Sequence, residues 1–276
     1  MNSLLSLFIF LITTIIYFWF GKATLSLSDN NIDIATKDKI YAEYYKNNIY
    51  RTLFYFMAVL MGQILVNISY MSQLCSNSFF ENIGSGALLA FIPWFFIFGI
   101  MLIVLIIFPA LKNVFSNVIG YMCISWEANA LLSKIVNNDI SSNLPSEISP
   151  EEKSKLYKVG DFISKISGNK SMIINEFNLS NFNSIWNTPY LFKTNENNDT
   201  NKQQLYNIVL RKDNIGEFCW YLYTAFIVTS VVTYNTVQNG CSKSLGSMQS
   251  SAKEYSQISM DTASQKNIVN SQVYTM

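Results

Sequence analysis

The sequence predicts an all-α membrane protein with about four transmembrane helices and a mostly helical extramembrane domain between the third and the fourth. Half of the 276 residues are hydrophobic and 13% are charged, whereas soluble domains contain about 25% charged residues. Four apolar runs are close to or longer than the roughly 20 residues that a helix needs to cross a hydrocarbon core of about 30 Å. The more polar stretch 112–216 is long enough to form a modest core of its own.

The four apolar runs define the expected crossings. They cover Leu4–Phe20, Thr52–Tyr70, Gly86–Leu111 and Phe218–Val237. We interpret the first as a signal anchor, because no basic residue precedes it and no small-residue cleavage site follows. Pro93 interrupts the third run, and we interpret this break as a packing feature, since neighbouring helices tolerate such breaks.

Basic residues predict the orientation, because Lys and Arg are retained on the cytoplasmic side. Segment 21–51 contains five of them, 112–216 contains eleven and 71–85 contains none. Four crossings therefore place both basic segments on one side, opposite the N-terminus and the C-terminal tail. The expected organisation is an anchor helix (1–20), a membrane-surface segment (21–51), a transmembrane hairpin (52–111), an extramembrane domain (112–216), a fourth transmembrane helix (217–237) and a polar tail (238–276).

The membrane-surface segment is rich in tyrosine, with Tyr41, Tyr44, Tyr45 and Tyr50 in its second half. Tyrosine suits the headgroup level, where its ring and its hydroxyl both find partners. We expect a short helix lying on the membrane surface. An aromatic recognition surface is the alternative.

Polar side chains within the crossings predict contacts between helices. Gln63 and Asn67 are four residues apart and share a helix face, and Thr229 and Asn235 lie in the last crossing. Amides in lipid need partners, so we expect interhelical hydrogen bonds from these four residues. A conduction pathway is the alternative, but the second, third and fourth crossings lack Asp, Glu, Lys and Arg, which transport usually needs.

An amphipathic helix is expected directly after Pro109. Its apolar residues recur at three- and four-residue spacing and include Phe115, Ile119, Met122 and Trp126. Such a helix can lie along the membrane surface or cover the domain that follows. We predict that these four residues anchor it at the membrane surface.

The rest of the domain shows several local signals. A helix is expected over Ser149–Gly168, and the polar stretch 194–202 should be a mobile loop. A small sheet within Ile173–Leu210 is an alternative to an all-helical domain. Asn214 and Glu217 resemble a capping box that opens the last crossing.

The tail 238–276 is rich in Ser, Gln and Asn, and should become ordered only against a partner. Cys241 in this tail falls on the same predicted side as Cys75. This shared side motivates the hypothesis of a Cys75–Cys241 disulfide.

The composition disfavours most catalytic, metal-binding and phosphate-binding sites. Histidine is absent, which removes Ser-His, Cys-His and His-metal sites. The cysteines lack the spacing of zinc or redox motifs, and no Gly-rich phosphate loop occurs. We expect no enzyme, no cofactor, no metal, no small-molecule substrate and, at a net charge of +1, no nucleic-acid partner. A thiol oxidoreductase using Cys75 and Cys241 is the one enzymatic alternative.

Two stretches carry a resemblance. "FPALKNVFSNVIGYMCISWEANALLSKIV" (Phe108–Val136) and "KDNIGEFCWYLYTAFIVTSVVTYNTVQNGC" (Lys212–Cys241) resemble the multi-span minor capsid or inner-membrane proteins of nucleocytoplasmic large DNA viruses. The resemblance implies a virion protein in the internal lipid membrane, derived from host endomembrane, beneath an icosahedral shell. It implies no catalytic residue.

The expected function is therefore structural: a tether between the internal membrane and the capsid shell. Its partners would be the lipid bilayer and capsid or other membrane proteins, bound through 112–216 and 238–276. The alternatives are an accessory membrane subunit of an organellar respiratory or import complex, and a channel or transporter.

Overall fold

The computed structural model describes residues 2–22, 34–75, 79–137, 169–179, 181–189, 191–239 and 252–260, with a few positions between 149 and 161. The fold is all-α. The described residues contain no strand, only an isolated antiparallel bridge between Val136 and Phe192. The all-helical expectation is confirmed, and the alternative of a small sheet is not found in this part of the chain.

Four helical stretches are long and apolar enough to cross a membrane, as predicted: Leu4–Gly21, Glu43–Cys75, Ile83–Ile107 and Asp199–Gln238. The helices are, in chain order, α1 (Asn2–Ile16), η1 (Tyr17–Gly21), α2 (Ile34–Cys75), η2 (Phe79–Asn82), α3 (Ile83–Pro93), η3 (Trp94–Phe98), α4 (Gly99–Ile107), η4 (Pro109–Lys112), α5 (Asn113–Phe115), η5 (Ser116–Gly120), α6 (Tyr121–Ile135), η6 (Lys170–Glu176), α8 (Phe182–Trp186) and α9 (Asp199–Gln238).

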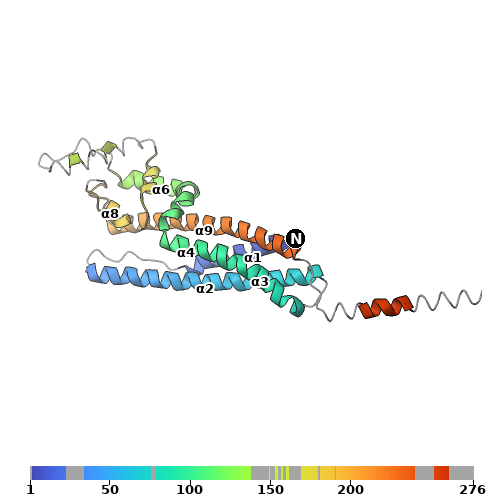
Figure 1. The fold of residues 1–276 in the computed structure, drawn as a ribbon. Coiled ribbons are helices and arrows are strands. Elements are labelled where there is room, and N and C mark those ends of the chain that lie inside the picture. The colour runs from blue at the N-terminus through green and yellow to red at the C-terminus, as the bar shows by residue number, and fades with distance from the viewer. Residues whose placement is uncertain are drawn as a thin grey trace, which may run out of the picture.

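The crossings form an up-and-down bundle (Figure 1). Helices α1 and α3 each pack against both α2 and α9. The N-terminus lies beside the C-terminal end of α9, whereas α6 and α8 lie beside its N-terminal half. Lys22, Lys112 and Glu217, which follow the first crossing, follow the third and precede the fourth, therefore meet at one end of the bundle.

Helix α9 extends far beyond its membrane crossing. Its 40 residues span about 60 Å, twice the hydrocarbon thickness. The helix begins after Asn198, whose side chain accepts a hydrogen bond from the backbone N–H of Asn201 at 2.9 Å. The prediction of a capping box at Asn214 and Glu217 is therefore wrong, and the stretch 194–202 includes the first helical turn instead of being a loop throughout.

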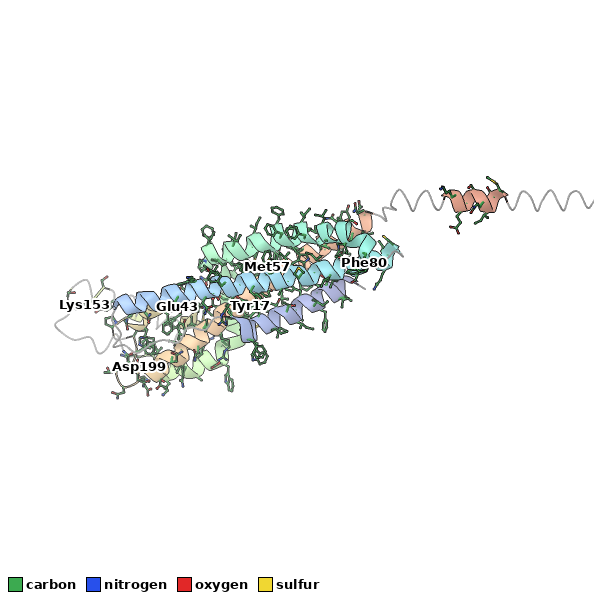
Figure 2. All side chains as sticks on the ribbon, turned by 90° about the horizontal axis from the view of Figure 1, so that it is seen from below. Tyr17, Glu43, Met57, Phe80, Lys153 and Asp199 are labelled. Atoms are coloured by element: carbon green, nitrogen blue, oxygen red, sulfur yellow. The ribbon has the colours of Figure 1, made fainter. Side chains whose placement is uncertain are left out.

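Helix α2 is also longer than a crossing, with 42 residues from Ile34 to Cys75. Its first half continues the axis of the second crossing without a break, as Figure 2 shows along its length. The helical part of segment 21–51 therefore does not lie on the membrane surface as a separate helix. Continuous propagation adds one hydrogen bond per residue, and nothing in 34–51 interrupts it, since this stretch contains neither Pro nor Gly.

Two hydrophobic cores lie along α9. The bundle core contains Tyr221, Ala225, Val228 and Val232 of α9, together with aromatic residues such as Trp94. The domain core contains other α9 residues, packed against α6, η6 and α8: Leu205, Tyr206, Ile208 and Val209. One uninterrupted helix thus belongs to both cores.

The third crossing is interrupted as its sequence indicated. Pro93 is buried and is followed by the π-helical turn η3, after which α4 resumes at Gly99. A side chain at Gly99 would approach Phe56, because its Cβ would lie 3.0 Å from the Phe56 ring. The interpretation of the break as a packing feature agrees with this close approach, and Pro109 begins η4 just beyond the end of α4.

Two other predicted segments are described in part. The backbone N–H of Lys153 donates to the Ser149 carbonyl at 2.9 Å, as in the first turn of the expected helix. The apolar stripe of that helix lies outside the described residues. Within the tail, 252–260 is helical, and the remainder beyond Asn239 lies outside the described residues.

Candidate functional site: a charged junction below the bundle

Hydrogen-bonded polar side chains run through the bundle at the positions where the sequence predicted interhelical contacts. We call Ser6, Gln63, Asn67 and Thr236 the polar seam. Gln63 bonds Ser6 twice, accepting from the Ser6 hydroxyl and donating to the Ser6 carbonyl. Asn67 donates to the Gly86 carbonyl at 2.8 Å and accepts from Thr236 at 3.0 Å. These bonds join α1 to α2 and α2 to both α3 and α9.

The other two predicted residues contribute less to this seam. Thr229 lies 3.5 Å from the Ser6 hydroxyl, at the edge of hydrogen-bond distance. Asn235 is half-buried, and its neighbour Thr236 bonds Asn67 instead. A cavity of about 20 Å³ beside Gln63 and Asn67 has room for about one water. A cavity of this size is what packed helices leave between them, as expected for residues that form interhelical contacts.

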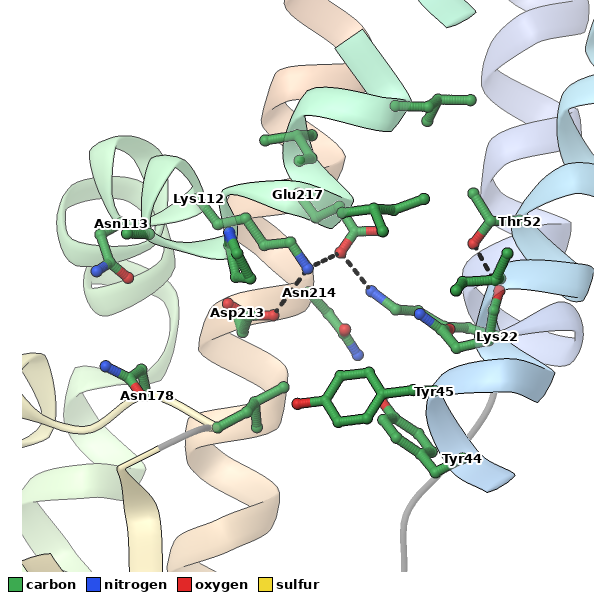
Figure 3. Close-up of a pocket in the computed structure, with 18 of the residues that line it drawn as sticks. Lys22, Tyr44, Tyr45, Thr52, Lys112, Asn113, Asn178, Asp213, Asn214 and Glu217 are labelled. Carbon is green, nitrogen blue, oxygen red and sulfur yellow. Dashed lines mark hydrogen bonds and ion pairs between the residues drawn. The ribbon is translucent and has the colours of Figure 1, made fainter. Parts of the chain in front are cut away.

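Four charged side chains meet where the bundle joins the domain (Figure 3). Lys22 follows the first crossing, Lys112 follows the third, and Asp213 and Glu217 lie on α9. The ammonium groups of Lys22 and Lys112 lie 2.8 and 2.5 Å from the same Glu217 oxygen. Lys112 also lies 3.4 Å from Asp213. We call these four residues the charge cluster.

The charge cluster is nearly inaccessible to solvent. The side chains of Lys22 and Glu217 are each 7% exposed, and the Tyr221 hydroxyl donates to the second Glu217 oxygen at 2.7 Å. Burial lowers the pKa of Lys22 despite the attraction of Glu217. Burial opposes protonation of Lys112 too, but the negative charges of Glu217 and Asp213 raise its pKa above the ordinary value. Glu217 is therefore the common counterion for two buried lysines.

The charge cluster was not predicted from the sequence, because each of its residues has a simpler local interpretation. Glu217 was assigned to a helix cap, and the lysines were used only for orientation. One sequence feature does point to the cluster: Lys22, Lys112 and Glu217 each adjoin an apolar run, at the end that faces the basic side. Three charges at one depth in a bundle are close enough to pair.

Close packing holds the cluster in place. A Cβ atom at Gly216 would lie 2.6 Å from the Ser116 side chain and 2.8 Å from the Lys112 carbonyl. A Cβ atom at Gly120 would lie 2.7 Å from the Lys212 carbonyl. Glycine at these two positions lets η5 approach α9 at backbone distance.

Lys212 is a second buried cation, 2% exposed, on the domain side of the cluster. Its ammonium donates to Asn117 at 2.9 Å and to the carbonyls of Ile174 and Phe177 at 2.9 and 3.1 Å. It thereby joins α9, η5 and the end of η6. These three bonds satisfy its donors.

A cavity of about 310 Å³ opens beside the charge cluster. In Figure 3 the Asn214 amide and the Tyr45 ring lie next to the paired charges. The walls combine the four charged side chains with amides, tyrosines and the apolar end of α4: Tyr44, Tyr45, Asn48, Thr52, Leu102, Leu105, Ile106, Pro109, Asn214 and others.

The predicted surface-anchor residues occupy different environments. Phe115 packs edge-on against Trp220 at 5.0 Å between ring centroids, and Ile119 is half-buried. Met122 and Trp126 are exposed, Trp126 at 89%. Helix α6 lies beside the N-terminal half of α9 and packs against it (Figure 1). The anchoring of the four residues at the membrane surface stays a prediction.

The cysteines divide into two groups. Cys75 is disulfide-bonded, whereas Cys123 and Cys219 are free. Cys241, its predicted partner, lies outside the described residues. The Cys75–Cys241 pairing therefore stays a prediction.

This chain matches no protein-family model, no curated protein and no solved structure.

Proposed function

We propose that this protein is a structural tether, which holds an internal viral membrane at a fixed position relative to the protein shell around it. The observation that carries the proposal is the continuity of α9 between the bundle core and the domain core. A helix of about 60 Å that belongs to both cores sets the distance and the tilt of the domain relative to the membrane.

The charge cluster supports a rigid connection. Lys22 and Lys112 come from different crossings and both pair with Glu217 on α9. The Trp220 indole also donates to the Leu111 carbonyl at 2.9 Å. Bending at this level would separate buried charges from their counterion, which costs several kcal/mol.

An exposed apolar row supports partner binding by the domain. Val114, Val118, Met122 and Trp126 follow one another at four-residue spacing and are all more than half exposed. A row of this kind, with a Trp at its end, is typical of an anchor for another protein. The viral particle as the setting, with capsid proteins as partners, comes from the resemblance of Phe108–Val136 and Lys212–Cys241.

Lysine cross-linking followed by mass spectrometry tests the proposal. Purified particles and infected-cell membranes would be cross-linked in parallel, and Lys134 and Lys193 on the domain report its neighbours. We expect cross-links from these lysines to capsid proteins inside the particle. Absence of the protein from particles, with cross-links to respiratory or import subunits instead, would contradict the proposal and favour an organellar subunit.

A further inference from the structure

The cavity beside the charge cluster has three properties that point to a ligand. It lies at the level where all four crossings end, because Lys22, Thr52, Pro109 and Glu217 lie at or next to the ends of the four apolar runs and all line it. Its volume of about 310 Å³ is at the small end of ligand sites. Leu102, Leu105 and Ile106 of α4 form an apolar part of the wall, and the charged and amide side chains form a polar part.

The charges in the walls balance. Lys22 and Lys112 face Asp213 and Glu217, and both lysines are already paired. An anion entering the cavity would meet two carboxylates as well as two ammonium groups. The described walls therefore favour a group without net charge over an anion.

Two acceptors in the walls lack donors. The side-chain oxygens of Asn48 and Asn214 are buried and have no hydrogen-bond partner in the structure, and both residues line the cavity. A buried acceptor without a donor costs about 1–3 kcal/mol, so a ligand that brings N–H donors is favoured here. Tyr44 and Tyr45 also line the cavity; aromatic rings attract primary and quaternary ammonium groups alike, so the choice between the two rests on the amide oxygens.

We propose that the cavity binds the headgroup of a zwitterionic phospholipid that carries a primary ammonium, of the phosphoethanolamine class. The ammonium supplies three N–H donors for the oxygens of Asn48 and Asn214, and the phosphate faces Lys22 and Lys112. The acyl chains leave along Leu105 and the rest of the α4 wall toward the bilayer. A choline headgroup has no N–H and leaves both acceptors unpaired. The assignment does not depend on which protein the domain binds.

Native mass spectrometry of the full chain tests this assignment. Delipidated protein in detergent would be mixed with equal amounts of phosphatidylethanolamine, phosphatidylcholine and phosphatidylglycerol. We expect phosphatidylethanolamine to be retained about tenfold more than phosphatidylcholine, as the loss of two hydrogen bonds implies. We also expect it to be retained more than phosphatidylglycerol, whose headgroup has hydroxyl donors but whose net negative charge the two carboxylates in the walls disfavour. Equal retention of the choline lipid, or preferential retention of the glycerol lipid, would overturn the assignment.

Variants separate binding from folding. The double variant Asn48→Ala, Asn214→Ala should lose the tenfold preference and melt no lower than the parent in lipid-free detergent, because it removes two unpaired acceptors. Asn207→Ala, at an exposed position on the same helix, should keep the preference. A double variant that keeps the preference, or an Asn207→Ala variant that loses it, would contradict the proposed contacts.

Soluble glycerophosphoethanolamine separates a lipid from a free metabolite with the same headgroup. We expect it to displace the lipid only at a large excess, because it lacks the chains that contact α4. Displacement at equal concentration would contradict a lipid ligand.

Discussion

The ammonium of Lys22 lies 2.8 Å from the carboxylate of Glu217, and this buried ion pair joins the end of the first crossing to the start of the last. Lys112 completes it from the third crossing. These ion pairs thus connect the first and third crossings to α9 at the level where the domain begins. Its stability should depend on Glu217 more than on any exposed ion pair.

Glu217→Gln should destabilise the protein strongly. The variant leaves Lys22 and Lys112 buried without their shared counterion, and breaking a buried ion pair costs about 3–5 kcal/mol. Thermal unfolding in detergent measures the effect. Glu127→Gln is the matched control, because its pair with Arg211 is about half exposed and should contribute less than about 1 kcal/mol. Equal effects of the two substitutions would contradict the role of the charge cluster.

Gly216→Ala should also destabilise the protein, by about 1–3 kcal/mol. The new methyl group would lie within 2.8 Å of Ser116 and of the Lys112 carbonyl, so η5 and α9 must move apart. Gly84→Ala provides the comparison, since its Cβ would meet nothing within 4 Å and Ala favours a helix by up to about 1 kcal/mol over Gly. A melting temperature that is unchanged in the first variant would show that the close approach is not required.

Trp126→Ala should leave unfolding nearly unchanged, within about 0.5 kcal/mol, because the side chain is 89% exposed. It should instead reduce the cross-linking of the domain to its partners. Trp186→Ala should do the opposite, at a cost of about 3–5 kcal/mol, because Trp186 is buried in the domain core. A large loss of stability in the Trp126 variant would mean that its surroundings in the isolated protein are not those described.

Thiol counting tests the predicted disulfide. Alkylation of the denatured, unreduced chain should label two cysteines, Cys123 and Cys219, and labelling after reduction should reach four. Peptide mapping would then identify Cys241 as the partner of Cys75. Four labelled thiols before reduction would end the hypothesis.

The sequence predicted the number, order and position of the crossings, because an apolar run of this length has few other uses. It also predicted that Gln63 and Asn67 lie on one helix face, as helical periodicity requires. Periodicity did not predict the lengths of α2 and α9. Their extramembrane halves have mixed composition, and what extends α9 is the burial of Leu205 and Val209 in a core formed by distant residues.

The charge cluster could be anticipated only in part. The flanking positions of Lys22, Lys112 and Glu217 are visible in the sequence, but their convergence on one carboxylate depends on how the bundle closes. The close contact at Gly216 depends on η5, a π-helical turn that no sequence signal indicated. Both the charge cluster and the contact at Gly216 therefore depend on long-range packing, which short-range sequence patterns do not encode.

Rigid coupling of the domain to the bundle is the central claim, and a distance distribution between two spin labels tests it most directly. One label would be placed on Cys123, which is exposed on α6, and the other on Met61→Cys, exposed on α2, in a Cys219→Ala background. We predict a single narrow distribution in lipid that broadens when Glu217→Gln is introduced. A broad or multimodal distribution in the parent protein would contradict the claim.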